Sequence, residues 1–185
     1  TAAQAEIDKM EIPTGINVEI SGSYEDQQEA FGDLLLLGLL IILLVYIVMA
    51  TQFESLLYPF IIMFTIPFAM SGVFIALWMT NTPLSIIALI GAIMLVGIVT
   101  KNGIVMVDYM NLLVERGKSV ADAVIEGGKS RLRPVLMTSL TTVLGMVPMA
   151  MGIGEGSEIW QPMGVAVVGG LVVSTFLTLF IVPSL

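Results

Sequence analysis

The sequence predicts an all-α membrane protein, a bundle of five transmembrane helices preceded by a short α/β fragment. The 185 residues are 57% apolar and only 12% charged, whereas soluble globular chains average about 45–50% apolar and 25% charged residues. Five apolar stretches follow one another, each near the roughly 20 helical residues that cross a hydrocarbon core about 30 Å thick. A soluble domain would expose large apolar patches, so we expect the lipid bilayer as surroundings.

The first segment, residues 1–30, differs from the rest because it is acidic and contains a single lysine. Ala2–Met10 has the pattern of a helix end, Pro13–Gly15 that of a turn, and Ile16–Ile20 alternates as a short strand. A helix–turn–strand piece of this length cannot fold alone. We therefore expect its sheet partners elsewhere, and a separate transmembrane domain over residues 31–185.

The loops between the apolar segments predict the orientation. Five of the seven Lys and Arg residues lie in the loop Val114–Arg133, which the positive-inside rule places in the cytoplasm. Trp78 and Trp160 fall at the opposite ends of their spans, as interfacial residues do. The N-terminal fragment is then expected outside and the C-terminus inside. The expected spans are about 31–52, 56–79, 84–113, 132–153 and 160–183.

The cationic loop contains a further predicted element, an amphipathic helix at about residues 119–127 on the inner membrane surface. Ser119 begins a capping-box pattern that ends at Asp122, and one face of the helix is apolar. The pair Gly127-Gly128 is a typical stop signal.

Lys101 is the most informative residue, because it lies within the third apolar span. An ammonium there costs about 2.5–3.5 kcal/mol on insertion scales and normally pairs with an acid inside a bundle. Snorkelling to the inner surface is the alternative, but Asp108, near that surface, is two turns away, about 10 Å. No acid lies deep within the other four spans, since Asp33 and Glu54 lie near the ends of the first one. We therefore expect a functional lysine whose carboxylate partner comes from helices outside this chain.

Two further patterns lie in the last two spans. Thr138, Thr141, Thr142 and Gly145 share one face of the fourth span. The threonine hydroxyls would either relay protons or bond to carbonyl groups one turn back, and spacing leaves both open. In the fifth span small residues recur at every fourth position, which predicts a helix-packing seam. This seam consists of Ala166, Gly170, Ser174 and Thr178.

Composition excludes several kinds of site. The chain has no Cys and no His, which removes the usual zinc ligands, thiol nucleophiles and imidazole bases. The 13 Met are scattered through apolar stretches, which favours core packing over a soft-metal site. We expect no metal, and the net charge of −8 argues against a nucleic-acid partner.

Four motifs resemble the second half of resistance–nodulation–division (RND) transporters, most closely the hydrophobe/amphiphile efflux branch. They are TQFESLLYP, VGIVTKNGIVMVDY, SRLRPVLMTSLTTVLGMVPMA and the terminal FIVPSL. The resemblance implies a piece of a longer inner-membrane pump of bacteria, with twelve spans in two halves. This chain would supply the tail of a periplasmic porter subdomain and the last five spans. The family's pumps are homotrimers that use the proton motive force and no other cofactor, together with a periplasmic adaptor and an outer-membrane channel.

The resemblance also assigns candidate roles. Lys101 matches the lysine that answers two intramembrane aspartates of the missing N-terminal half, with Asn102 beside it, and Arg131 and Thr138 match the relay residues of the next span. The metal-efflux branch is expected to have an acid in this span and a lysine in the next; no lysine lies in residues 134–153. The expected function is therefore drug export by proton antiport, without enzymatic chemistry. The alternative is a non-transporting membrane subunit or scaffold in which Lys101 is an assembly charge, and a membrane hydrolase is a weaker third reading.

Overall fold

The structure is a computed structural model that describes residues 23–184, with side chains described for residues 27–179. The expected helix and strand before residue 21 lie outside the described residues. Within the described part there are helices and no strands, and five helical segments are long and apolar enough to cross a membrane. The five-helix bundle predicted from the sequence is thus confirmed. The helices are α2 (Ser23–Phe53), α3 (Leu57–Met63), α4 (Thr65–Met79), α5 (Ile86–Glu115), α6 (Val120–Ala150) and α7 (Ser157–Ser184).

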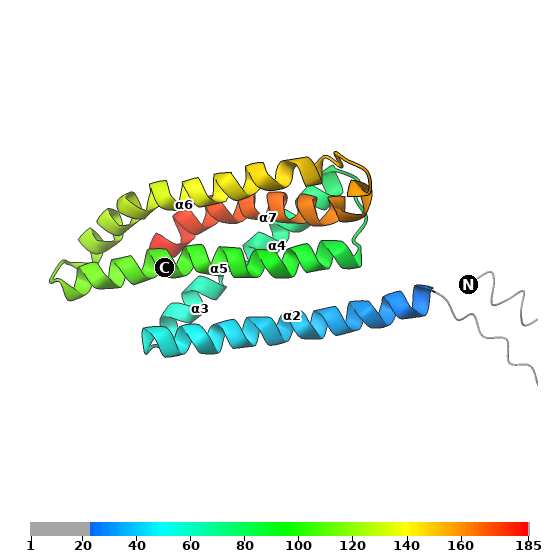
Figure 1. The fold of residues 1–185 in the computed structure, drawn as a ribbon. Helices are drawn as coiled ribbons and strands as arrows, with labels where there is room; N and C mark the ends of the chain where they lie inside the picture. The colour runs from blue at the N-terminus through cyan, green and yellow to red at the C-terminus, as the bar shows by residue number, and fades with distance from the viewer. Residues whose placement is uncertain (1–22, 185) are drawn as a thin grey trace, which may run out of the picture.

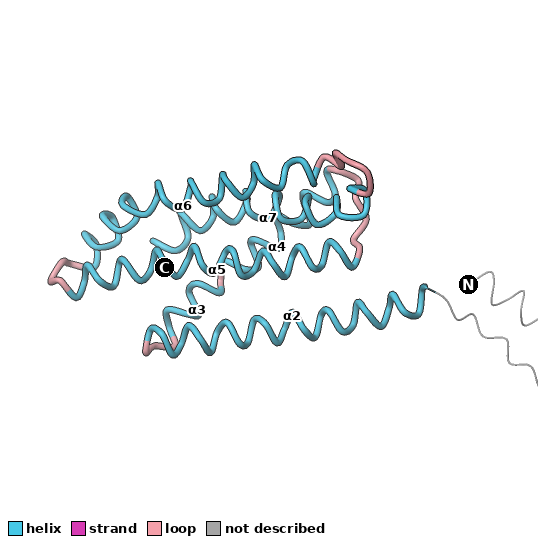
Figure 2. Tube along the Cα trace, in the orientation of Figure 1, coloured by secondary structure: helices cyan, strands magenta, loops and turns pink. Residues whose placement is uncertain are grey.

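Helices α5 and α7 form the centre of the bundle. In the most apolar 18-residue stretch of α5 and of α7, half of the residues are buried, whereas the corresponding share is 6% in α2 and 11% in α6. Helix α7 packs against α4, α5 and α6, and Figure 1 shows α2 along the side of α5 that is away from α6. The loops lie at the two ends of the bundle (Figure 2). Much of the surface of α2 and α6 is therefore left for lipid or for other helices.

Glycines let α4 and α7 approach closely. A Cβ added at Gly72 would lie 2.7 Å from Val173 Cβ and 3.0 Å from the carbonyl oxygen of Gly169. In lipid the hydrophobic effect does not draw helices together, so close van der Waals packing between small residues stabilises such crossings. The cluster around this crossing contains buried residues from α4, α5 and α7, among them Val73, Leu95 and Leu171. A second buried cluster, nearer the turn after α2, contains Met49, Ile62, Met106, Val107 and Met110.

The second span is interrupted, since α3 ends at Met63 and α4 begins at Thr65. Pro67 explains the interruption, because proline has no N–H to donate to the carbonyl group of Met63 and its ring crowds that carbonyl. Phe64 between them keeps helical angles, so the span bends without unwinding.

Helix α6 corrects one expectation. The amphipathic helix expected at residues 119–127 does not end at Gly127-Gly128, because α6 runs without a break from Val120 to Ala150. A Cβ at Gly127 would lie 2.6 Å from Met110 Cγ on α5. This glycine therefore allows close contact between α5 and α6. The amphipathic segment and the fourth span are parts of one helix.

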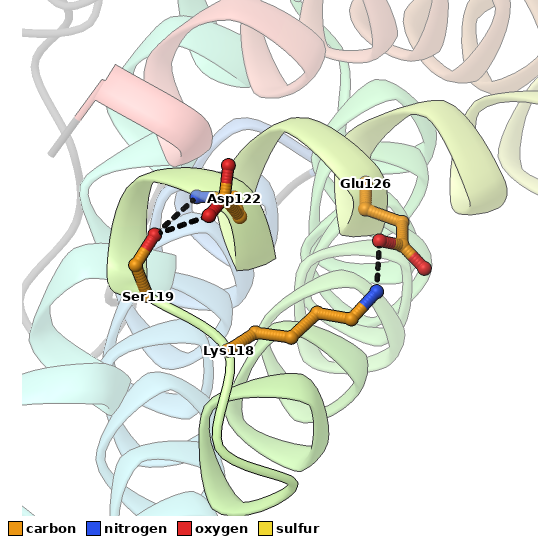
Figure 3. A network of polar contacts seen from close by, with 4 residues as sticks. All are labelled: Lys118, Ser119, Asp122 and Glu126. Atoms are coloured by element: carbon orange, nitrogen blue, oxygen red, sulfur yellow. Dashed lines mark hydrogen bonds and ion pairs between the residues drawn. The ribbon is translucent and has the colours of Figure 1, made fainter.

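The beginning of α6 has the cap that the sequence predicts (Figure 3). The Ser119 hydroxyl accepts a hydrogen bond from the Asp122 backbone N–H at 3.2 Å and donates one to the Asp122 carboxylate at 2.6 Å. Lys118, just before the cap, pairs with Glu126, about two helical turns after Ser119. These contacts fix where the chain turns from α5 into α6.

Candidate functional site

Lys101 lies on a face of α5 that the other described helices leave open. Its side chain is exposed, as are those of Met94, Asp108 and Leu112 and the backbone at Gly97. These positions follow one another at helical spacing and form a stripe, which we call the open face of α5. Among the described side chains, Lys101 forms no ion pair. The structure thus places the charge where an additional helix would contact it.

Asn102, the next residue, points to a different neighbour. Its side-chain amide donates to the Ser139 hydroxyl of α6 at 3.4 Å. Thr175 of α7 donates to the same hydroxyl oxygen at 3.0 Å. Ser139 and Thr175 are buried, with 6% and 7% of their surface exposed. We call Asn102, Ser139 and Thr175 the three-helix junction.

The threonines of α6 bond within their own helix. Thr138 donates to the carbonyl oxygen of Val135 at 3.0 Å, Thr141 to that of Met137 at 2.8 Å and Thr142 to that of Thr138 at 2.9 Å. This is the local back-bonding that sequence spacing left open as the alternative to a relay. In this structure, Thr138 is therefore not hydrogen-bonded to Asn102 or to Lys101.

Arg131 lies two turns before Ser139 on α6 and contacts an aromatic ring of α5. Its guanidinium carbon is 4.4 Å from the centroid of the Tyr109 ring. The side chain is half-buried, and its Nε atom is buried without a hydrogen-bond partner among the described residues. The ring face therefore supplies the main favourable contact for this cation. Of the four residues expected in a proton relay, Lys101 thus lies on the open face, Asn102 in the junction and Arg131 against Tyr109, and the hydroxyl of Thr138 bonds within α6.

The Arg131–Tyr109 contact gives a stability prediction. We expect Tyr109→Leu to destabilise the full-length protein by about 0.5–2 kcal/mol, because the guanidinium loses the ring face. Tyr109→Phe keeps that face and should unfold close to the wild-type temperature. Thermal unfolding of the purified protein in detergent tests this. Equal unfolding temperatures for the Leu and Phe variants would contradict it.

The seam residues of α7 lie in the centre of the bundle. Ala166, Ser174 and Thr178 have at most 2% of their surface exposed. A Cβ at Gly170 would meet Leu95, would lie 2.8 Å from Val73 Cγ2 and 3.2 Å from the Ala69 carbonyl oxygen. The Ser174 hydroxyl bonds within α7, to the Leu171 carbonyl oxygen at 3.2 Å. The Thr178 hydroxyl is buried without a hydrogen-bond partner among the described residues.

Nothing in the sequence distinguishes Ser139, Thr175 or Tyr109 as a site residue. Each looks ordinary in its own helix: Ser139 lies in a run of hydroxyl residues, and Thr175 is next to the seam. Their roles depend on how α5, α6 and α7 pack: Ser139 meets Asn102 and Thr175, which are 37 and 36 positions away in the sequence, and Tyr109 of α5 meets Arg131 of α6. A helical wheel of one span carries no such information.

The chain is similar to known membrane transport proteins over nearly its whole length. The family model described as the AcrB/AcrD/AcrF family matches residues 1–185. The multidrug resistance protein MdtC of Erwinia amylovora is 41% identical over 186 residues, which cover 98% of this chain and 18% of that protein. The cobalt-zinc-cadmium resistance protein CzcA of Cupriavidus metallidurans is 39% identical over 177 residues, which cover 96% of this chain and 17% of that protein.

A solved structure is similar as well. The crystal structure of a heavy metal efflux pump matches with a TM-score of 0.78 at 33% sequence identity, and the match covers 99% of this chain and 18% of that one. The chain therefore spans less than a fifth of the length of the proteins that it matches. Relatives named for drugs and for metals are both similar to it.

Proposed function

Because the chain belongs to the AcrB/AcrD/AcrF family of RND efflux transporters, we propose that it supplies the C-terminal membrane half of a proton-driven pump. Such a pump would export drugs or other amphiphilic compounds. One observation carries this proposal: Lys101 lies exposed on the open face of α5 and forms no ion pair among the described side chains. A charge within an apolar span is costly without a partner. The missing N-terminal half would provide that partner.

The proposed mechanism uses this partner as a switch. A deprotonated carboxylate of the N-terminal half would pair with the Lys101 ammonium across the open face of α5. Protonation of the carboxylate would remove the attraction, and α5 would move to another packing arrangement. Proton entry and helix movement would then be linked, because each state of the acid favours one arrangement. The movement would drive substrate export in the periplasmic part of the pump.

We further propose organic substrates. By family resemblance, two features favour the drug-exporting branch: a lysine, Lys101, lies in the third span, and no lysine lies in residues 134–153 of the fourth. The test uses the complete gene in a bacterial host without its own RND pumps, with Lys101→Met as matched control. We expect raised tolerance to cationic dyes and detergents for the wild type alone. Raised tolerance to cobalt, zinc or cadmium salts, with none to organic compounds, would overturn the assignment.

The proposed setting is the inner membrane of a bacterium, in a homotrimer that contacts a periplasmic adaptor and an outer-membrane channel. Chemical cross-linking of the complete protein in cells tests the trimer. A species of three subunits is expected, and a monomer or dimer at full activity would contradict the proposal.

The orientation is tested by cysteine labelling, since the chain contains no cysteine. Ser130 and Glu155 are exposed and lie on opposite sides of the fourth span expected at residues 132–153, Ser130 within α6 and Glu155 after its end. Because the cationic loop is expected in the cytoplasm, we expect a membrane-impermeant maleimide added to intact spheroplasts to label Glu155→Cys and to leave Ser130→Cys unlabelled. Inside-out vesicles should give the reverse. Labelling of Ser130→Cys alone in spheroplasts would show that the proposed orientation is inverted.

A further inference from the structure

The three-helix junction differs from every other buried hydroxyl contact of the described residues. The hydroxyls of Thr65, Thr100 and Ser174 are buried too, but each bonds to a carbonyl group of its own or the directly preceding helix segment. Only the bonds from Asn102 to Ser139 and from Thr175 to Ser139 join side chains of different helices within the described part of the bundle. The Ser139 oxygen accepts both. One hydroxyl thus connects α5, α6 and α7.

The junction is also next to the proposed switch. Asn102 follows Lys101 directly in α5, so a rotation or shift of α5 that moves one side chain moves the other. Helix α7, at the other end of the junction, packs against α4, α5 and α6. A change at Asn102 therefore has a direct polar route to the central helix of the bundle.

We propose that the three-helix junction couples the state of Lys101 to α6 and α7, with Ser139 and Thr175 as positioning residues of the transport cycle. This inference rests on the proposed function. A buried polar group that loses its partner costs more free energy than its hydrogen bond contributes. The junction therefore favours arrangements in which both bonds are made, or in which Asn102, Ser139 and Thr175 all find new partners. Such an element has discrete states, which is what coupling between helices requires.

Two substitutions at Thr175 separate coupling from packing. Thr175→Val keeps the shape of the side chain and removes the hydroxyl, whereas Thr175→Ser keeps the hydroxyl and removes a methyl group. If the residue serves only to fill space, Val is the better replacement. If its bond to Ser139 matters, Ser is the better one. Thr100→Val is the matched control, because the buried Thr100 hydroxyl bonds only to carbonyl groups of its own helix.

Ser139→Ala removes the shared acceptor while it leaves little empty space. Its matched control is Ser174→Ala, which removes a buried hydroxyl that bonds within α7. Both are small changes, so a variant at Ser139 remains informative even if Thr175→Val fails to fold.

The measurement is the amount of a cationic dye exported per proton taken up, by the full-length protein in liposomes with an imposed proton gradient. We expect Ser139→Ala and Thr175→Val to lower this ratio about three- to tenfold, the effect of one interhelical hydrogen bond in a membrane. Thr175→Ser and the two controls should keep it near the wild-type value. The pH at which transport is half-maximal should shift in the same two variants.

Three results would overturn the coupling role of the junction or the proposed function, and they can be told apart. If Ser139→Ala and Thr175→Val keep the wild-type ratio and pH profile while Lys101→Met is inactive, the junction has no coupling role and the proposed function stands. If Lys101→Met transports like the wild type, the proposed function itself fails. A lower ratio in Thr175→Ser than in Thr175→Val would also overturn the proposal, since it would show that packing decides.

Discussion

We expect Lys101→Met in the full-length protein to abolish drug export while the protein remains assembled in the membrane. The methionine side chain is apolar and of similar length, so the span loses a costly charge and no folding contact that the structure describes. Without the ammonium, the carboxylates of the N-terminal half would have no partner to release on protonation. Cellular accumulation of a fluorescent substrate, at equal membrane abundance of each variant, is the measurement.

The matched control is Lys118→Met, which removes a cation at the end of the bundle. Lys118 and Glu126 are both well exposed, and surface pairs of this kind contribute about 0–1 kcal/mol. Export should therefore be unchanged in this variant. Lys101→Arg should be impaired as well, because a planar guanidinium replaces a compact ammonium poorly. Normal export by Lys101→Met would assign the lysine to a structural role.

The second large effect is expected from Gly170→Leu, which should prevent assembly of the bundle. A side chain at this position would meet Leu95 and Val73 and crowd the backbone of α4 at Ala69. Because the neighbours include backbone, the helices would have to separate, and overpacking of this kind costs about 1–3 kcal/mol or more. The yield of folded, assembled protein after detergent extraction is the measurement.

Gly32→Leu is the control, since no atom of the described residues lies within 4 Å of a Cβ added there. It should assemble normally. Gly170→Ala should fall between the wild type and Gly170→Leu. Normal assembly of Gly170→Leu with an altered range of substrates would show that this face is a substrate path and not a packing face.

The fold was predictable from the sequence because the bilayer imposes a length and a composition on each span. The one clear error was at Gly127-Gly128, where a local stop signal was overridden by contact with Met110 of α5. A glycine that permits close approach and a glycine that ends a helix look the same in one sequence. Tertiary packing decides between them.

The candidate site was predictable only where a single residue is unusual in its own span. Lys101 stands out because a charge in an apolar span is rare. Ser139 and Thr175 do not stand out, because their bond depends on how α6 and α7 are paired and rotated. The hydroxyl stripe of α6 could not be interpreted from spacing for the same reason, and in the structure Thr138, Thr141 and Thr142 bond within their own helix.

The most direct test of proton-driven export uses the purified full-length protein in liposomes, with substrate and proton movements recorded together. When a proton gradient is imposed, we expect the wild type to move substrate in the direction opposite to the protons, and a protonophore to stop both movements. Lys101→Met should show neither. Substrate movement by the wild type at the same rate without a gradient, or unchanged coupled movement in Lys101→Met, would contradict the account.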